Sequence, residues 1–458
     1  MSRAASLAQP AEELSPALTL SGVARFWWPL AASWMLMGSE LPALSAVLAR
    51  LPNPEIHLGA YGVVFSISLI IEAPVIMLLA ASTALSKDWT SYFKLRRFMM
   101  RMAAILTALH VLVAFTPLFD VLMIRVIGLP DELMAPSRIG LQIMTPWTWA
   151  IAYRRFNQGV LIRFDHTRAV GLGTAVRLAA DVIVLAIGYL VGTLPGVVVG
   201  TSAVIAGVVS EALYAGLRVR PVLRDELKAA PPVSPPLAFP DIVTFYVPLA
   251  LTSLIWLVIQ PIGSAALSRA PMPIESLAVW PVMSGFIFVF RSMGMAYNEA
   301  VVALLEKPDA AQALRRFTII LTVGSTLPLA IIALTPLSSL WFGDVSGLSP
   351  ELAALARAAL PLALLMPTLQ PWVSWHQGTL VYRRNTRSIT ESVVLFVLVT
   401  SGILWAGVAW GQVPGIFLIW AAFTLGTVAQ TAWLWIRQRQ GPTSMATCTQ
   451  QATASPTA

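Results

Sequence analysis

Hydrophobic positions in this sequence form long runs rather than the narrow stripes of a soluble protein. The run 61–85 is typical, because it is apolar almost throughout and carries a single carboxylate, Glu72, near its middle. A run of this length predicts a transmembrane helix. Similar runs predict twelve spans, near residues 24–47, 58–85, 98–120, 135–157, 169–190, 195–217, 243–266, 277–303, 317–341, 353–377, 388–410 and 414–436.

The composition agrees with this pattern. Of 458 residues, 57% are hydrophobic and 11% are charged, whereas soluble domains carry about 25% charged residues. We therefore predict an all-α polytopic membrane protein, and the absence of alternating hydrophobicity excludes an outer-membrane barrel. Segment 1–23 has no apolar core of a signal peptide and is interpreted as a cytoplasmic segment. The polar tail 440–458 is predicted to be disordered.

An internal repeat organises the chain. Residues in the first half recur 219 positions later without a gap, and the matches include dipeptides and tripeptides along six successive spans. The prediction is two six-helix repeats, 24–220 and 241–439, joined by a Pro-rich cytoplasmic linker, 221–240. Examples are Arg96-Arg97-Phe98 with Arg315-Arg316-Phe317, Thr116-Pro117-Leu118 with Thr335-Pro336-Leu337, Pro42 with Pro261, and Arg50 with Arg269.

Loop charges give the topology. Two copies with an even number of spans must be parallel repeats, related by an axis along the membrane normal. The formal charge of +8 collects in the loops after even-numbered spans, which the positive-inside rule assigns to the cytoplasm together with both termini. In the first half these loop charges are Lys87, Lys94, Arg96, Arg97, Arg154, Arg155, Arg163, Arg168, Arg218 and Arg220. This distribution explains the basic charge without nucleic acid, and no basic stripe interleaved with aromatics is present.

Charges inside the spans are candidates for function, because an ionisable group at mid-membrane is costly without a partner or a cavity. Under the repeat, Glu72 in the second span corresponds to Arg291 in the eighth. We expect the two to face one axis, where they form a gate or substrate site. The alternatives are a static buried ion pair or separate pairing of each residue with other groups.

Proline positions predict broken helices. Pro42 and Pro261 occupy equivalent places in spans 1 and 7, and Pro74 lies in span 2. Breaks at matching positions of two halves indicate a transport site, which makes Glu40 a candidate; the alternative is a packing kink with Glu40 at the outer interface. Further candidate substrate- or ion-binding residues are Gln260, Asn298 and Glu299.

Other charged residues have structural interpretations. Arg177 and Asp181 lie four positions apart in span 5, which predicts a structural ion pair. Glu211 and Glu391 are expected at the membrane interface. The histidines have no metal-ligand spacing, and we predict neither a metal site nor a cofactor, with H⁺ or Na⁺ as the coupling ion. These histidines are His57, His110, His166 and His376.

Motifs for catalysis are missing from the sequence. There is no P-loop, GxSxG, HExxH or Gly-rich dinucleotide turn, and no soluble stretch could hold an ATPase. We expect no enzymatic activity, and transport driven by an ion gradient.

The repeat and several short motifs resemble the multidrug/oligosaccharidyl-lipid/polysaccharide (MOP) exporter superfamily, which has the MATE-like fold. Within it, the chain is similar to the progressive ankylosis (ANK) family, through Gly38-Ser39-Glu40, Ala60-Tyr61-Gly62 and Val247-Pro248-Leu249-Ala250-Leu251. The resemblance implies an alternating-access exporter of a small organic or phosphorylated anion, with a cavity lined by spans 1, 2, 7 and 8. Leu69 stands where the family carries a basic residue, and Glu72 adds an acidic one, so a cation-coupled route stays open.

The sequence therefore predicts a secondary-active exporter of a small solute in the cytoplasmic (inner) or plasma membrane. The alternatives are a MATE-type cation or drug antiporter and a flippase for a lipid-linked saccharide. The expected partners are the substrate and membrane lipid, with no nucleic acid, and the expected state is a monomer.

Overall fold

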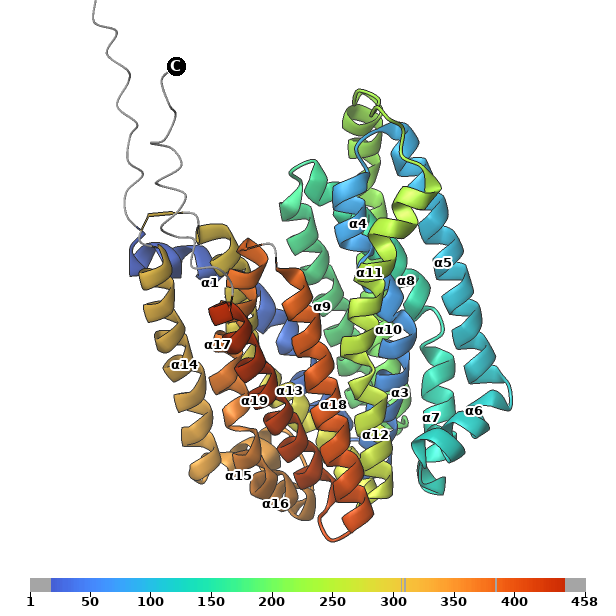
Figure 1. Ribbon diagram of the computed structural model, residues 1–458. Coiled ribbons are helices and arrows are strands. Elements are labelled where there is room, and N and C mark those ends of the chain that lie inside the picture. Colours follow the sequence, from blue (N-terminus) through green and yellow to red (C-terminus); the bar gives the residue numbers. More distant parts are fainter. Residues whose placement is uncertain (1–17, 306, 309, 384, 441–458) are drawn as a thin grey trace, which may run out of the picture.

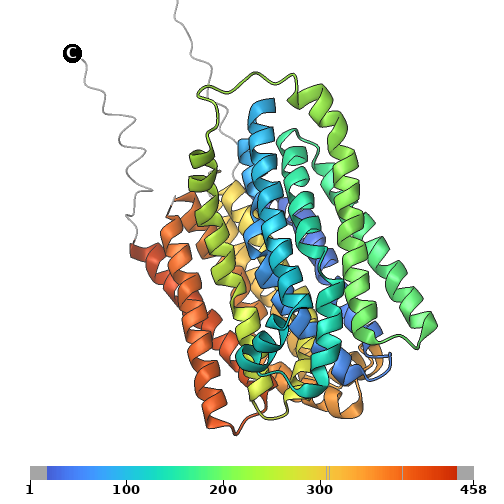
Figure 2. The ribbon, with the colours of Figure 1, turned by 90° about the vertical axis from the view of Figure 1, so that its right-hand side faces the viewer.

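The computed structural model describes residues 18–440 apart from 306, 309 and 384, and all regular structure within them is helical. The predicted disordered tail lies almost entirely outside the described residues, as does most of the segment 1–23. Residues 20–23 belong to the first helix. Two helical groups stand side by side in Figure 1. The linker between α10 and α11 runs across one end of the molecule in Figure 2.

The first half contains the helices up to the linker. They are α1 (Leu20–Gly38), α2 (Glu40–Leu48), α3 (Pro54–Ile76), α4 (Leu78–Leu85), α5 (Trp89–Phe115), α6 (Leu118–Asp120), the π-helical turn η1 (Val121–Ile127), α7 (Asp131–Ile143), α8 (Trp147–Arg163), α9 (Thr167–Val191), α10 (Gly196–Val222) and the π-helical turn η2 (Leu223–Leu227).

The second half repeats this order. Its elements are α11 (Phe239–Leu257), α12 (Ile259–Arg269), α13 (Pro273–Leu304), α14 (Ala310–Leu334), α15 (Leu337–Ser339), the π-helical turn η3 (Leu340–Val345), α16 (Pro350–Ala359), the 3₁₀ turn η4 (Leu360–Ala363), α17 (Leu365–Tyr382), α18 (Thr386–Trp410) and α19 (Gly415–Gln440). Several pairs begin 219 positions apart, such as α3 with α13 and α10 with α19. The sequence repeat is therefore a structural repeat.

Eleven helical segments of the described chain are long and apolar enough to cross a membrane. This finding confirms a multi-pass α-helical protein but not the count of twelve. The predicted span 135–157 is divided between α7 and α8, because the chain turns at Met144–Pro146. Proline at 146 lacks a backbone donor and favours this interruption, and Leu365 stands at the equivalent place in the second half.

Prolines account for the helix breaks. A proline removes the bond to the carbonyl four residues earlier. Accordingly, α1 ends at Gly38, four residues before Pro42, and α11 ends at Leu257, four residues before Pro261. Pro74 lies inside α3, and the break follows at Met77.

The linker is shorter than predicted. Helix α10 runs through Pro221 to Val222 and continues as η2 to Leu227. The irregular segment therefore spans residues 228–238.

The first helix of each half lies on the opposite half. Helix α1 packs mainly on α13, and α11 packs mainly on α3; Figure 1 shows α1 among the helices of the second half and α11 among those of the first. Beyond the breaks, α2 packs on α9 and α10 of its own half as well as on α13, and α12 packs on α18 and α19 as well as on α3. The broken helices therefore cross between the halves.

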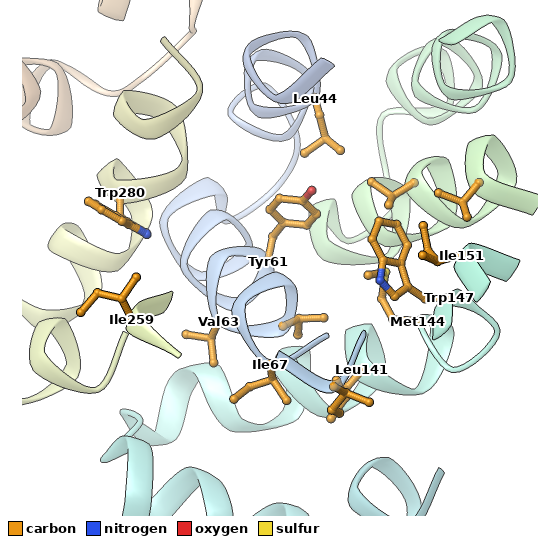
Figure 3. Packing of buried hydrophobic residues seen from close by; sticks show 14 of the residues in the cluster. Leu44, Tyr61, Val63, Ile67, Leu141, Met144, Trp147, Ile151, Ile259 and Trp280 are labelled. Atoms are coloured by element: carbon orange, nitrogen blue, oxygen red, sulfur yellow. The ribbon is translucent and has the colours of Figure 1, made fainter. Parts of the chain in front are cut away.

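A continuous apolar core joins the two groups. Around Tyr61 and Ile67 of α3 it includes Trp147 on one side and Trp280 on the other (Figure 3). Large apolar side chains also face outward, such as Leu190, which is 82% exposed. A soluble protein rarely exposes such surfaces, so they are the lipid-facing sides of an integral membrane protein.

Candidate functional site

A cluster of charged side chains lies inside the first half, and we call it the charged cluster. It comprises four carboxylates and three guanidinium groups from five helices. They are Glu40 (α2), Glu72 (α3), Arg154 and Arg155 (α8), Arg177 and Asp181 (α9), and Glu211 (α10). These residues carry the charge that the membrane interior must accommodate.

One part of the cluster sits at the break between α1 and α2. Nη2 of Arg177 donates to Oε1 of Glu40 at 2.7 Å, and both side chains keep 12–13% of their area exposed. Glu40 is the first residue of α2, where free backbone N–H groups favour a carboxylate. The ion pair therefore connects α9 to the point at which the first span is broken.

Asp181 adds a carboxylate on the other side of Arg177. Its Oδ2 lies 3.9 Å from Nε of Arg177, and neither of its oxygens has a hydrogen-bond partner among the described residues. Asp181 is buried against Gly207 of α10, where a Cβ atom would lie only 1.9 Å from Oδ1. Two carboxylates thus share one guanidinium group, at very different distances.

A second part of the cluster is satisfied and buried. Arg154 forms an ion pair with Glu211, and Nε2 of Gln158 donates to the other oxygen of Glu211 at 2.9 Å. This arrangement corrects one prediction, because Arg154 is not a loop charge but lies inside α8. Glu211 is only 2% exposed and is engaged in this ion pair. Burial of each charge is tolerated because the other compensates it.

Glu72 is buried between these parts. Its Oε2 has no hydrogen-bond partner in the described chain, and the positive charges that act on it are those of Arg154, Arg155 and Arg177. The predicted facing partner, Arg291, is not among them. Within the described residues Glu72 forms no ion pair.

Arg291 instead faces its own half. Its Nη2 donates to Oε1 of Gln370 on α17 at 2.9 Å, and its Nε has no partner among the described groups. Equivalent positions of a repeat meet equivalent neighbours, so position 72 faces α8 and position 291 faces α17, the counterpart of α8. Proximity to a common axis does not make the two side chains point toward each other.

The remaining predicted residues do not join the cluster. Asn298 donates to the backbone carbonyl of Ser374 at 3.3 Å, and Glu299 is exposed. Gln260 is half-buried one residue before Pro261 on α12. All three lie on helices of the second half.

Two arginines link the halves at the end opposite the linker, and we call their contacts the arginine latches. From the first half, Nη2 of Arg50 donates to the backbone carbonyls of Asp344 at 2.5 Å and Val345 at 3.0 Å. From the second half, the guanidinium of Arg269 donates to carbonyls at the end of η1, at 2.6 Å for Ile127, 2.7 Å for Val126 and 3.1 Å for Arg125.

The latches obey the repeat, since Arg50 and Arg269 are equivalent and so are their acceptor segments. Carbonyls at the end of a helical turn lack donors and carry partial negative charge, which favours a guanidinium group. Gly128 and Gly347 end the turns with φ of +73° and +72°. A Cβ atom on Gly347 would lie 2.8 Å from Nη1 of Arg50, so these glycines leave room for the arginines.

Solved structures share this architecture. The lipid II flippase MurJ in an inward closed conformation aligns with a TM-score of 0.72 and 13% identity over 90% of this chain and 88% of its own. An inward-facing multidrug resistance MATE family transporter of the MOP superfamily aligns with 0.67 and 14% identity over 91% of this chain and 99% of its own. The Vibrio cholerae MATE transporter VcmN aligns with 0.60 and 14% identity over 92% and 97%.

The chain has the fold of the MATE transporters. The resemblance inferred from the sequence is confirmed at the level of this fold, and the likeness to the ANK family stays a prediction. No protein-family model matches the sequence, and no curated protein matches it.

Within this MATE-like fold, the sequence reasoning missed the residues around Glu72. Arg154 and Arg155 were counted as cytoplasmic loop charges. A signal was present in the repeat, because their equivalents are Val373 and Ser374, and that of Glu211 is Gln430. A charged residue whose equivalent in the other half is neutral marks a place where the two halves differ.

Proposed function

We propose that the protein is a secondary-active transporter that moves a small solute outward by alternating access between its two halves. The observation that carries this proposal is the surplus of carboxylates in the charged cluster at the broken helix. Four carboxylates face three guanidinium groups. One negative charge therefore needs a cation, and a proton or Na⁺ from a gradient supplies it.

The position of Glu40 converts ion binding into movement. Helix α1 packs on the second half, α2 packs partly on the first, and Glu40 begins α2 at the break. Neutralising Glu40 or Asp181 changes the ion pairs of Arg177 at the break between α1 and α2. An ion that binds with unequal affinity to the two arrangements of this break shifts the balance between the two access states.

The arginine latches supply the outer closure in this proposal. The positive-inside rule assigns the linker end to the cytoplasm, so the latches lie on the outer side. With both latches formed, the halves are held together outside, and the outward-facing state requires both to break.

Arg291 supports an anionic substrate. It is the guanidinium group at the place where the first half has Glu72, and within the described residues it has no carboxylate partner. A buried unpaired cation is costly, and an anionic group of the substrate compensates it. Nε of Arg291 is a free donor for this purpose.

A flippase for a lipid-linked saccharide is the second candidate. Arg291 lacks a carboxylate contact within the described chain, and a diphosphate group offers charge for it. An aqueous solute and a lipid-linked one are distinguished by whether transport requires lipid in the donor leaflet.

The first experiment tests the cation site by thermal stability of the purified protein. A ligand that binds the folded state raises the melting temperature. We expect the melting temperature of the wild type to change when Na⁺ replaces choline at constant ionic strength, or when the pH changes. The double variant Glu40→Gln/Asp181→Asn should lose this change in melting temperature. Glu351→Gln is the matched control, because it removes an exposed carboxylate that lies outside the cluster and is not a candidate ion-binding residue. A response that persists in the double variant would refute the cluster as the coupling site.

The second experiment measures transport in proteoliposomes under imposed pH or Na⁺ gradients, with citrate as an anionic probe and ethidium as a cationic one. We expect Glu72→Gln to abolish transport of the accepted probe while expression and monodispersity are kept. Arg291→Gln is expected to abolish transport of citrate but not of ethidium. Wild-type rates in Glu72→Gln would contradict the proposal.

A further inference from the structure

The cytoplasmic ends of α5 and α11 enclose a cavity that the charged cluster does not use. Its volume is about 270 Å³, and it is lined by Lys94, Arg97, Phe98, Arg101, Phe239 and Ile242. Four of these residues belong to α5 of the first half, and two belong to α11, the first helix of the second half. The cavity therefore lies where the first helix of the second half packs among the helices of the first half, at the end opposite the latches.

Three cations line this cavity on one side of α5. Lys94 is committed in part, because its Nζ donates to the backbone carbonyl of Leu237 at 2.7 Å. Arg97 and Arg101 are exposed and form no ion pair within the described residues. The nearby carboxylate of Asp241 is occupied as a cap of its own helix, accepting from the backbone N–H of Ala238 at 2.8 Å. The two guanidinium groups therefore have free donors.

The opposite wall is apolar. Phe98 packs edge-to-face against Tyr246 with ring centroids 5.2 Å apart, and Ile242 is fully buried. Phe239 is 57% exposed, so this wall opens onto the lipid-facing surface. A ligand that fits both walls carries an anionic group beside an apolar chain.

The depth of the cavity matches the headgroup layer. Helix α5 has 27 residues and is about 40 Å long, whereas the hydrocarbon core is about 30 Å thick. With this excess of about 10 Å at the linker end, Lys94 lies in the headgroup region, and Arg97 and Arg101 reach it with their long side chains.

The second half lacks this arrangement, although it repeats the helices. The positions equivalent to Lys94 and Arg101 are Ala313 and Ile320. There α14 packs against α1, with Phe317 edge-to-face on Trp27 at 5.4 Å. Arg97 is kept as Arg316, so the helix packing does not require the other two cations, Lys94 and Arg101.

We propose that this cavity binds the phosphate headgroup of an anionic phospholipid of the cytoplasmic leaflet. The guanidinium groups of Arg97 and Arg101 hold the phosphate oxygens, and an acyl chain lies along Phe239 and Phe98. Basic pockets between transmembrane helices on the cytoplasmic side recognise such headgroups. The bound lipid then holds the first helix of the second half, α11, against the first half at the end opposite the latches. This proposal does not depend on the identity of the transported solute.

The test is lipid binding to delipidated protein in detergent, measured by native mass spectrometry and by thermal shift. Dioleoyl phosphatidylglycerol is titrated against dioleoyl phosphatidylcholine, and soluble glycerol phosphate serves as a third probe. We expect the phosphatidylglycerol adduct and its thermal shift in the wild type, and affinity weaker by about tenfold or more in Arg97→Gln/Arg101→Gln, since two charge-assisted contacts are lost.

The matched control is Arg218→Gln/Arg220→Gln, which removes two exposed cations at the same end of the molecule away from the cavity. Retained binding in this control supports the site. Equal weakening in both double variants would reduce the effect to general surface charge and overturn the proposal. An equal shift with phosphatidylcholine, or a full shift with glycerol phosphate alone, would also overturn it, the latter in favour of a soluble phosphate ligand.

Discussion

Removal of the arginine latches should open the end of the molecule opposite the linker. Arg50 makes two hydrogen bonds to the second half, and Arg269 makes three to the first. A hydrogen bond to a charged group contributes about 1.5–3 kcal/mol when shielded. These guanidinium groups are largely exposed, and we discount each bond to about 0.5–1 kcal/mol. The five bonds together then favour closure by about 2.5–5 kcal/mol, and we take about 3–4 kcal/mol as the middle of this range.

This free energy predicts a measurable shift of population. A change of 3–4 kcal/mol alters an equilibrium about 100- to 1,000-fold. An open state populated at about 1% would then become the equal or major state in Arg50→Gln/Arg269→Gln. Each single variant should lie between the wild type and the double variant, since each leaves one latch in place.

The assay is electron paramagnetic resonance distance measurement between two spin labels at the latch end. Suitable sites are Glu132→Cys and Glu351→Cys, which are equivalent in the repeat and exposed. The only native cysteine is removed by Cys448→Ser. We expect one short-distance population in the parent and an added long-distance population in the double latch variant.

The matched control is Arg125→Gln. Arg125 is exposed at the same end but contributes only its backbone carbonyl to a latch. An unchanged distance distribution in the double latch variant, or the same broadening in the control, would refute the role assigned to the two guanidinium groups.

Two further predictions concern stability. Gly207→Ala should lower the free energy of unfolding by about 1–3 kcal/mol, because its Cβ would overlap the buried carboxylate of Asp181. The control is Gly171→Ala, whose Cβ meets nothing within 4 Å and whose free energy of unfolding in chemical denaturation should stay within about 1 kcal/mol of the wild type. Equal losses in the two variants would contradict this reason. Asp88 caps α5 outside the membrane spans. Burial raises the pKa of its carboxyl group, but hydrogen bonds from Ser91 and Val233 lower the pKa by more, so the pKa lies below its usual value. Its charge therefore stabilises the fold above about pH 4, and this stabilisation is lost as the pH falls through the lowered pKa. Asp88→Asn should thus reduce the melting temperature more at pH 7 than at acidic pH, with the difference narrowing as the pH falls below about 4, and a pH-independent gap would contradict the assignment.

Local and periodic features of this fold were readable from the sequence. Pro42 and Pro261 act on the carbonyls four residues earlier, and the helices end there. The constant offset of 219 predicted which helices of the two halves correspond, because the two repeats have the same length and the same pattern of hydropathy. Pro146 was a local signal as well, but it lies within an apolar run, so hydropathy counted one span where the structure has two shorter helices.

Long-range pairing could not be read in the same way. Arg154 looks like a cytoplasmic charge because its neighbours are polar, and only the packing of α8 on α10 brings it to Glu211. The proposed partnership of Glu72 and Arg291 failed for a related reason. Equivalence in a repeat specifies which helix a side chain faces, and here that helix belongs to its own half.

The exchanged first helices have a consequence for biogenesis. Because α11 covers α3, the surface of α3 that this helix occupies stays open to lipid until residues 239–257 have been synthesised. Helix α1 leaves the ribosome first but finds its main partner, α13, only after residue 273. The helices of the first half therefore remain in the membrane as an incomplete bundle until the second half is inserted, and the two halves reach their final packing together.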